Sequence, residues 1–247
     1  MFISGLKSRY ELLTSPLWAF PRVPVLSNFK NVLTSEISIY FKNSVIVMVI
    51  SVILILFISS LASYVFSRIN FRFNKIIFSL IVAGIAIPIH ITLIPIYILI
   101  RDIGLYNSIF ALIGPYVAFH IPLSIFILTE YMKTIPKELE EAAYIDGCNL
   151  KLTFFKIVLP LSKPALVTLG IYNAIMIWNE FVFVLVLISS PANRTLPLGI
   201  WEFQTRYQAD IPKIMAFLTL ASLPLIIVYL FASEKIEKGM VAGALKQ

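Results

Sequence analysis

The stretch SVIVMVISVILILFISSLASYVF, which runs from Ser44 to Phe66, decides the fold class. None of its 23 residues is charged. As a helix with a rise of about 1.5 Å per residue it is about 35 Å long, which is enough to cross the hydrocarbon core of a bilayer with some tilt. Its apolar residues do not alternate with polar ones as in a half-buried strand, so we expect a transmembrane α-helix.

Four further runs are long and apolar enough to cross a membrane. They are Ile76–Ile100, Ile109–Thr129, Pro164–Ile188 and Ile214–Ala232. The composition agrees, since 59% of the 247 residues are apolar, only 13% are charged and the mean hydropathy is +0.91. Soluble domains carry about twice that charged fraction, roughly 25%. The chain is therefore predicted to be an all-α integral membrane protein, a helical bundle of about five visible transmembrane helices.

Prolines occur within several of these runs. They are Pro88, Pro95, Pro115, Pro122 and Pro224. Each proline removes one backbone hydrogen bond and favours a kink. Membrane helices tolerate proline in general, but four prolines in two successive runs favour bent helices around a cavity.

Basic residues predict the orientation. One side of the five spans holds eleven of them: Arg68, Arg72, Lys75, Lys133, Lys137, Lys151, Lys156, Lys163, Lys235, Lys238 and Lys246. The other side holds four: Arg101, Arg194, Arg206 and Lys213. By the positive-inside rule, the loop 130–163 and the C-terminal tail 233–247 are cytoplasmic. The transmembrane domain then covers residues 44–232, and the N-terminal segment 1–43 is external.

Composition also excludes several kinds of site. The net charge of +7 is scattered over short loops, without a basic stripe interleaved with aromatic residues, so no nucleic acid is expected. Cys148 is the single cysteine, so the chain can build neither an intrachain disulfide nor a cysteine metal site. His90 and His120 are lone histidines in different spans, so we expect no metal ion.

The loop between the third and fourth runs contains PKELEEAAYIDGCN, from Pro136 to Asn149. A short helix is predicted, with three glutamates near the positive end of its dipole and Gly147 as a left-handed stop. One face of this helix is predicted to hold Leu139, Ala142, Ala143 and Asp146. Asn149 then caps a second helix. The small and acidic face suits docking into a partner, and a solvated surface loop is the alternative on these features alone.

The wider pattern resembles a known family. Glu141-Ala142-Ala143, then Gly147 after three residues, then Ile157 and Leu159-Pro160, is similar to the EAA loop of permease subunits of binding-protein-dependent ABC importers. The segments WNEF (Trp178–Phe181) and RTLPLGIWEFQTRY (Arg194–Tyr207) look like the carbohydrate-uptake branch. Within it they resemble the second permease of maltose-type and glycerol-3-phosphate-type transporters.

This resemblance implies a set of partners. The loop would be the coupling helix that docks into one of two ATPase subunits, through Leu139, Glu141, Ala142, Ala143, Asp146 and Gly147. A second permease subunit and an external solute-binding protein would complete the transporter, which would carry a sugar or sugar derivative through the cell membrane. ATP and Mg²⁺ would be held by the ATPase, since this sequence has no GxxxxGK[ST] motif and should bind no cofactor itself.

Two further groups of residues are candidate sites. Asn173, Trp178 and Glu180 are expected along the substrate pathway, because polar groups within membrane spans are functional candidates. The alternatives are hydrogen bonding between helices for Asn173, a place near water at the membrane interface for Glu180 and the outer aromatic belt for Trp178. By analogy with the family, the outer loop Ser189–Pro212 is expected to meet the binding protein, through Arg194, Thr195, Leu196 and Pro197.

Other readings stay open on the sequence. A membrane-embedded enzyme is the alternative of another class, although no nucleophile–base pair or HExxH helix is present. Importers of amino acids or polyamines are the alternative within transport. Family members usually have six spans, and the first 43 residues look like the external stretch after a first span. We therefore expect about 20 further apolar residues upstream of Met1, with a basic cytoplasmic end.

Overall fold

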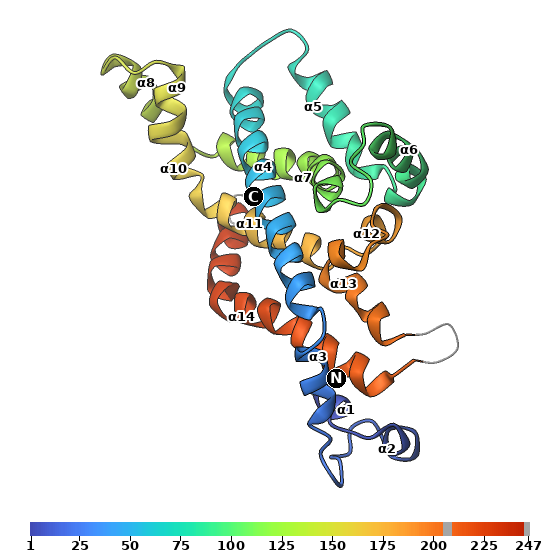
Figure 1. Cartoon of the computed structure of the whole chain (residues 1–247). Helices are drawn as coiled ribbons and strands as arrows, with labels where there is room; N and C mark the ends of the chain where they lie inside the picture. The colour runs from blue at the N-terminus through green and yellow to red at the C-terminus, as the bar shows by residue number, and fades with distance from the viewer. Residues whose placement is uncertain (205–208, 245–247) are drawn as a thin grey trace. The chain divides into compact units, whose positions relative to one another are not determined.

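The computed structural model describes residues 1–204 and 209–244, and the described chain is helical (Figure 1). The α-helices are α1 (Phe2–Gly5), α2 (Arg9–Thr14), α3 (Ser27–Leu33), α4 (Ile37–Arg68), α5 (Asn74–Ala83), α6 (Ile89–Asp102), α7 (Ile113–Lys133), α8 (Glu138–Ile145), α9 (Leu150–Thr153), α10 (Leu159–Leu161), α11 (Lys163–Trp178), α12 (Val182–Leu187), α13 (Leu196–Gly199) and α14 (Ile211–Ala244). Short 3-10 helices are η1 (Gly84–Ala86), η2 (Ile109–Leu112), η4 (Pro191–Asn193) and η5 (Ile200–Phe203), and η3 (Phe154–Val158) is a π-helix. Among the described residues, extended pairing is limited to one bridge between Gln204 and Ala209. The predicted all-α class is confirmed.

Two of the predicted spans are helices in the structure, and both are long and apolar enough to cross a membrane. The run Ser44–Phe66 lies within α4, an unbroken helix of 32 residues, and the run Ile109–Thr129 lies within the helix Ile109–Lys133. The fifth run lies within α14, whose described apolar part is Ile211–Ile227. In the part of the chain that the structure describes, two helices reach the length of a span, or four if each of two bent pairs is one span.

The run Ile76–Ile100 is one of the bent pairs rather than one straight helix. Its two halves, Asn74–Ala86 and Ile89–Asp102, meet at an angle of 99°. Ile87 has an extended backbone (φ −76°, ψ 115°), as expected for a residue that precedes a proline, here Pro88. The predicted bend is therefore confirmed at Pro88.

The run Pro164–Ile188 was expected as one helix, and this is wrong. Helix α11 ends at Trp178, and α12 begins only at Val182. The helix Lys163–Trp178 instead forms the second bent pair with Leu150–Leu161, at 71°. Apolar residues continue on both sides of the break, which is why hydropathy alone did not reveal it.

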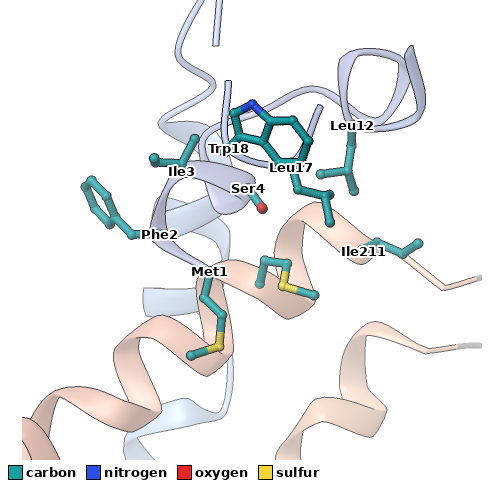
Figure 2. A pocket seen from close by; sticks show the side chains of 9 residues that line it. Met1, Phe2, Ile3, Ser4, Leu12, Leu17, Trp18 and Ile211 are labelled. Atoms are coloured by element: carbon teal, nitrogen blue, oxygen red, sulfur yellow. The ribbon is translucent and has the colours of Figure 1, made fainter. Parts of the chain in front are cut away.

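The chain divides into two compact units. The first holds residues 1–48, 97–112 and 178–230, and its core holds Val32, Ile37, Tyr40, Trp178, Leu196, Ala216 and Phe217. An apolar pocket of about 520 Å³ lies in this unit, with side chains from the first 18 residues facing Ile211 and Met215 of α14 (Figure 2). Among the described lining residues, the polar side-chain groups are the hydroxyl of Ser4 and the indole N–H of Trp18, so the pocket offers a polar solute few partners.

The second unit holds residues 49–96, 113–177 and the end of the chain. One cluster of its core joins Tyr64 of α4 to Met132, Ile135, Phe154 and Val158. Another joins Leu128 of α7 to Ala165 and Leu169 of α11. Gly84 lies close to α7, since a Cβ added there would be 3.3 Å from Pro122 Cγ. This unit contains the loop whose sequence predicted a docking site.

Candidate functional site

We call residues Glu138–Gly147 the docking segment. Its local structure follows the sequence prediction. Gly147 has φ +85°, its N–H donates to Tyr144 O at 3.1 Å, and the N–H of Cys148 donates to Ala143 O at 2.9 Å. This is the left-handed helix stop that glycine permits at little cost. The carboxamide Oδ1 of Asn149 accepts a hydrogen bond of 3.0 Å from Leu152 N, so the predicted cap of the next helix is also confirmed.

The exposed side of the docking segment differs in part from the predicted face. Leu139, Ala142 and Asp146 are exposed, but Ala143 is only 5% exposed and faces the protein. The inward side is formed by Glu140 and Ala143, which lie one turn apart. The predicted grouping of Ala143 with the exposed face is therefore wrong. Glu141 is exposed, and Ile145 is 87% exposed, so the described chain leaves this large apolar side chain uncovered.

The inward side holds a buried ion pair that the sequence analysis missed. Arg68 Nε at the end of α4 lies 2.5 Å from Glu140 Oε1, and the two side chains are 6% and 7% exposed. The Arg68 guanidinium also donates from Nη2 to Ile135 O at 2.9 Å. Removing one partner of a buried pair typically costs about 3–5 kcal/mol, because the other charge stays buried. The sequence showed Arg68 only as one of the basic residues that set the orientation.

An apolar layer covers this pair. The ring of Tyr64 packs against Phe154 with 5.1 Å between ring centroids, and its hydroxyl lies 3.4 Å from Glu140 Oε2. Phe154 begins the π-helical turn η3, a kind of irregularity that is frequent at functional sites. Helices α8 and α9 lie side by side (Figure 1), and both contact the π-helical turn η3. The inward side of the docking segment thus contacts α4 and η3, and its other side is exposed.

Asn173, the first of the predicted pathway residues, is buried within the second unit. Its side chain is 1% exposed and donates from Nδ2 to Ser124 Oγ at 3.2 Å, which links α11 to α7. Its Oδ1 accepts no hydrogen bond from the described residues. The contact agrees with the alternative of hydrogen bonding between helices.

Trp178 and Glu180 belong to the first unit and have structural partners there. Trp178 is 5% exposed, donates from Nε1 to Ala221 O at 3.2 Å and packs edge-on against Phe41. Its ring is therefore almost wholly covered by protein. Glu180 Oε1 accepts a hydrogen bond of 2.9 Å from Phe183 N at the start of α12. Because α11 ends at Trp178, Glu180 lies outside the helix that holds Asn173.

The predicted binding-protein loop is fastened to the start of α4. Asn43 donates to the carbonyl oxygens of Ala192 and Arg194, each at 2.9 Å, and Leu196 N donates to Ser44 Oγ at 2.9 Å. Thr195 is 4% and Leu196 is 1% exposed, so neither is available as a direct contact. Arg194 and Pro197 are half-buried. Arg206, with the rest of residues 205–208, and Lys246, with residues 245–247, lie outside the described residues.

Comparison with known proteins identifies the family. The family model for the binding-protein-dependent transport system inner membrane component matches residues 55–242. A putative ABC transporter permease protein, ORF2, of Caldicellulosiruptor sp. is 59% identical over all of this chain and 90% of its own length. The trehalose/maltose transport system permease protein MalG of Thermococcus litoralis is 37% identical over 95% of this chain and 85% of its own length.

A solved structure agrees in fold. One chain of a bacterial ABC transporter involved in the import of the acidic polysaccharide alginate matches with a TM-score of 0.81 and 22% identity, over 94% of this chain and 87% of its own. With this fold and the match of the family model, the chain belongs to the binding-protein-dependent transport system inner membrane components, the permease subunits of ABC importers.

Proposed function

We propose that the chain is one of two permease subunits of an importer that moves a sugar or sugar derivative across the cytoplasmic membrane. Relatives named for the transport of trehalose/maltose, starch degradation products and diacetylchitobiose support the solute class. ATP and Mg²⁺ are held by two separate ATPase subunits. The solute is delivered by an external binding protein to the side opposite the docking segment.

The observation that carries the proposal is the two-sided character of the docking segment. Its inner side is fixed by the buried Glu140 and Ala143, while Ile145 is 87% and Leu139 is 45% exposed beside the exposed Glu141. A helix that leaves large apolar side chains in water next to an acid is suited to a partner with an apolar cleft and a basic rim. We assign this partner as the ATPase subunit.

The outer loop meets the binding protein through its exposed residues in this proposal. Pro191, Ala192, Trp201 and Glu202 are exposed, and Trp201 retains 42% of its surface. Leu196 serves to hold the loop on α4, through the bond from its N–H to Ser44 Oγ, and Thr195 is buried beside it. Arg194 and Pro197, which are half-buried, complete the contact region.

The substitution Glu141→Lys tests the docking assignment. A like charge placed against the basic rim of the ATPase costs several kcal/mol at an interface, so uptake should be lost while the protein remains in the membrane at its normal level. Copurification of the ATPase subunit is the direct measurement. Glu138→Lys is the matched control, because Glu138 is also exposed and lies in the same first helical turn. Equal loss in both variants would mean that the helix itself was damaged and would contradict the assignment.

The solute class is tested by uptake into cells that carry the complete transporter. Maltose, trehalose and diacetylchitobiose are compared with glutamine and spermidine, with and without the gene for this chain. Uptake of at least one sugar should depend on the chain. Dependence confined to glutamine or spermidine would overturn the sugar assignment and leave the docking assignment untouched.

A further inference from the structure

We propose that Arg68, Glu140 and Tyr64 are positioning residues that fasten the docking segment to α4, so that a displacement of α8 is passed to α4 directly. We call this group the α4–α8 latch. The inference rests on the proposed function, in which the ATPase pulls on the docking segment. It adds the path by which that pull enters the permease.

The latch joins α4 to α8 through two charged side chains that are almost completely buried. Arg68 Nε and Glu140 Oε1 are 2.5 Å apart, and both side chains are at most 7% exposed. The same guanidinium donates to Ile135 O in the connection between α7 and α8. A guanidinium is planar and holds its donors in a rigid fork, so the hydrogen bond from Nη2 to Ile135 O orients the charged group beside Glu140.

Tyr64 reinforces the attachment from one helical turn away. Residues four apart on a helix share a face, so Tyr64 and Arg68 both project from α4 toward α8. The Tyr64 hydroxyl lies 3.4 Å from Glu140 Oε2, while its ring packs in the cluster of Met132, Ile135 and Phe154. This cluster excludes water from the ion pair, and an ion pair in a low dielectric is stronger than one in water.

The other acids of α8 do not make this attachment. Of the described acidic side chains in α8, Glu138 and Glu141 are exposed and Glu140 alone is buried. The receiving element is suited to carry motion, because α4 is an unbroken helix without proline over Ile37–Arg68. Two neighbouring acids thus have different roles in this proposal. Glu141 faces the partner, and Glu140 faces α4.

The experiment uses the complete transporter in proteoliposomes and compares ATP hydrolysis with and without the loaded binding protein purified from the same cells. The single variants are Arg68→Gln, Glu140→Gln and Tyr64→Phe. A double variant, the charge exchange, combines Arg68→Glu with Glu140→Arg. We expect each glutamine variant to retain the ATPase subunit and its basal hydrolysis. Stimulation by the binding protein should fall by about tenfold, the size of a typical coupling between sites. The charge exchange should restore a large part of it.

Tyr64→Phe keeps the ring packing and removes only the hydroxyl. It therefore still tests the latch if the charge variants fail to reach the membrane. It should lower stimulation by roughly twofold, the loss expected for one weak hydrogen bond. Arg72→Gln is the matched control, because Arg72 is exposed in the chain segment that follows α4. It should leave stimulation unchanged.

Two results would overturn the inference. One is full stimulation in Arg68→Gln, Glu140→Gln and Tyr64→Phe. The other is loss of the ATPase subunit from the glutamine variants without rescue by the charge exchange, which would assign the pair a purely structural role. Failure of the unmodified chain to retain an ATPase subunit would instead refute the proposed function, so the two failures are distinct.

Discussion

Gly199 is a position where the first unit has no room for a side chain. A Cβ added there would lie 2.5 Å from Tyr40 Cδ2 and 2.7 Å from Phe217 Cζ. Both rings are fully buried, so neither can move without opening the core. We expect Gly199→Ala to destabilise the protein by about 1–3 kcal/mol, as overpacking of a core does. A lower temperature of thermal unfolding in detergent would be the direct sign.

Gly114 provides the control for this prediction. It lies in the first turn of α7, and a Cβ added there would meet nothing within 4 Å. Gly114→Ala should therefore be neutral or stabilise by up to about 1 kcal/mol, because alanine loses less backbone entropy in a helix than glycine. Equal unfolding temperatures for the two variants would show that the close approach at Gly199 is not a constraint.

Residues with local signals could be predicted from the sequence, and residues with distant partners could not. Gly147 and Asn149 were predicted because a helix stop and a helix cap depend on neighbours within about four residues. The partner of Glu140 is far away in the sequence, and nothing local marks Arg68 as that partner. The hydrogen bond from Leu196 N to Ser44 Oγ likewise joins residues 152 positions apart.

At the scale of elements, the stop of α8 sets where the docking segment ends. Gly147 has φ +85° and open space around its Cβ position, so a substitution there acts through backbone strain alone. We expect Gly147→Val to add about 1–2 kcal/mol of strain and to abolish ATPase copurification and uptake, because the last turn of α8 must change. Gly147→Asn should retain both, since asparagine accepts the left-handed region more readily.

Gly104 offers a matched comparison for the stop of α8. It follows α6 with φ +77° and equally open surroundings, and the N–H of Leu105 donates to Ile100 O at 3.0 Å as that of Cys148 does to Ala143 O. Gly104→Val should therefore carry similar strain without loss of the ATPase subunit. Loss of the ATPase from Gly104→Val, with retention in Gly147→Val, would contradict the role of the docking segment.

Hydropathy predicted where the apolar helices lie but not where they break. The window average is insensitive to Asn179–Phe181, because apolar residues continue on both sides. The break is stabilised by contacts that need the folded chain, namely the bond of Trp178 to Ala221 and that of Glu180 to Phe183 N. Proline is also an incomplete signal, since α6 continues through Pro95 while the chain turns at Pro88.

At the scale of the whole molecule, labelling of the single cysteine can test the orientation of the chain in the membrane. Cys148 follows the docking segment and is partly exposed, and the excess of basic residues predicts that this loop is cytoplasmic. The comparison needs no substitution in the docking segment, because the native thiol is the probe. Ser189 is exposed in the outer loop, so Cys148→Ser combined with Ser189→Cys moves the probe to the predicted opposite side.

A membrane-impermeant maleimide should therefore modify Cys148 in inside-out vesicles and leave it unmodified in intact cells. The doubly substituted variant should show the reverse pattern, because position 189 is predicted to lie on the other side of the membrane from position 148. Binding of the ATPase subunit should slow the labelling of Cys148 in inside-out vesicles, because Cys148 directly follows Gly147, the last residue of the docking segment. Labelling of Cys148 from outside intact cells would indicate the opposite topology. The docking segment would then lie on the side of the membrane where ATP is absent. That result would contradict both the predicted orientation and the assignment of the ATPase as the partner.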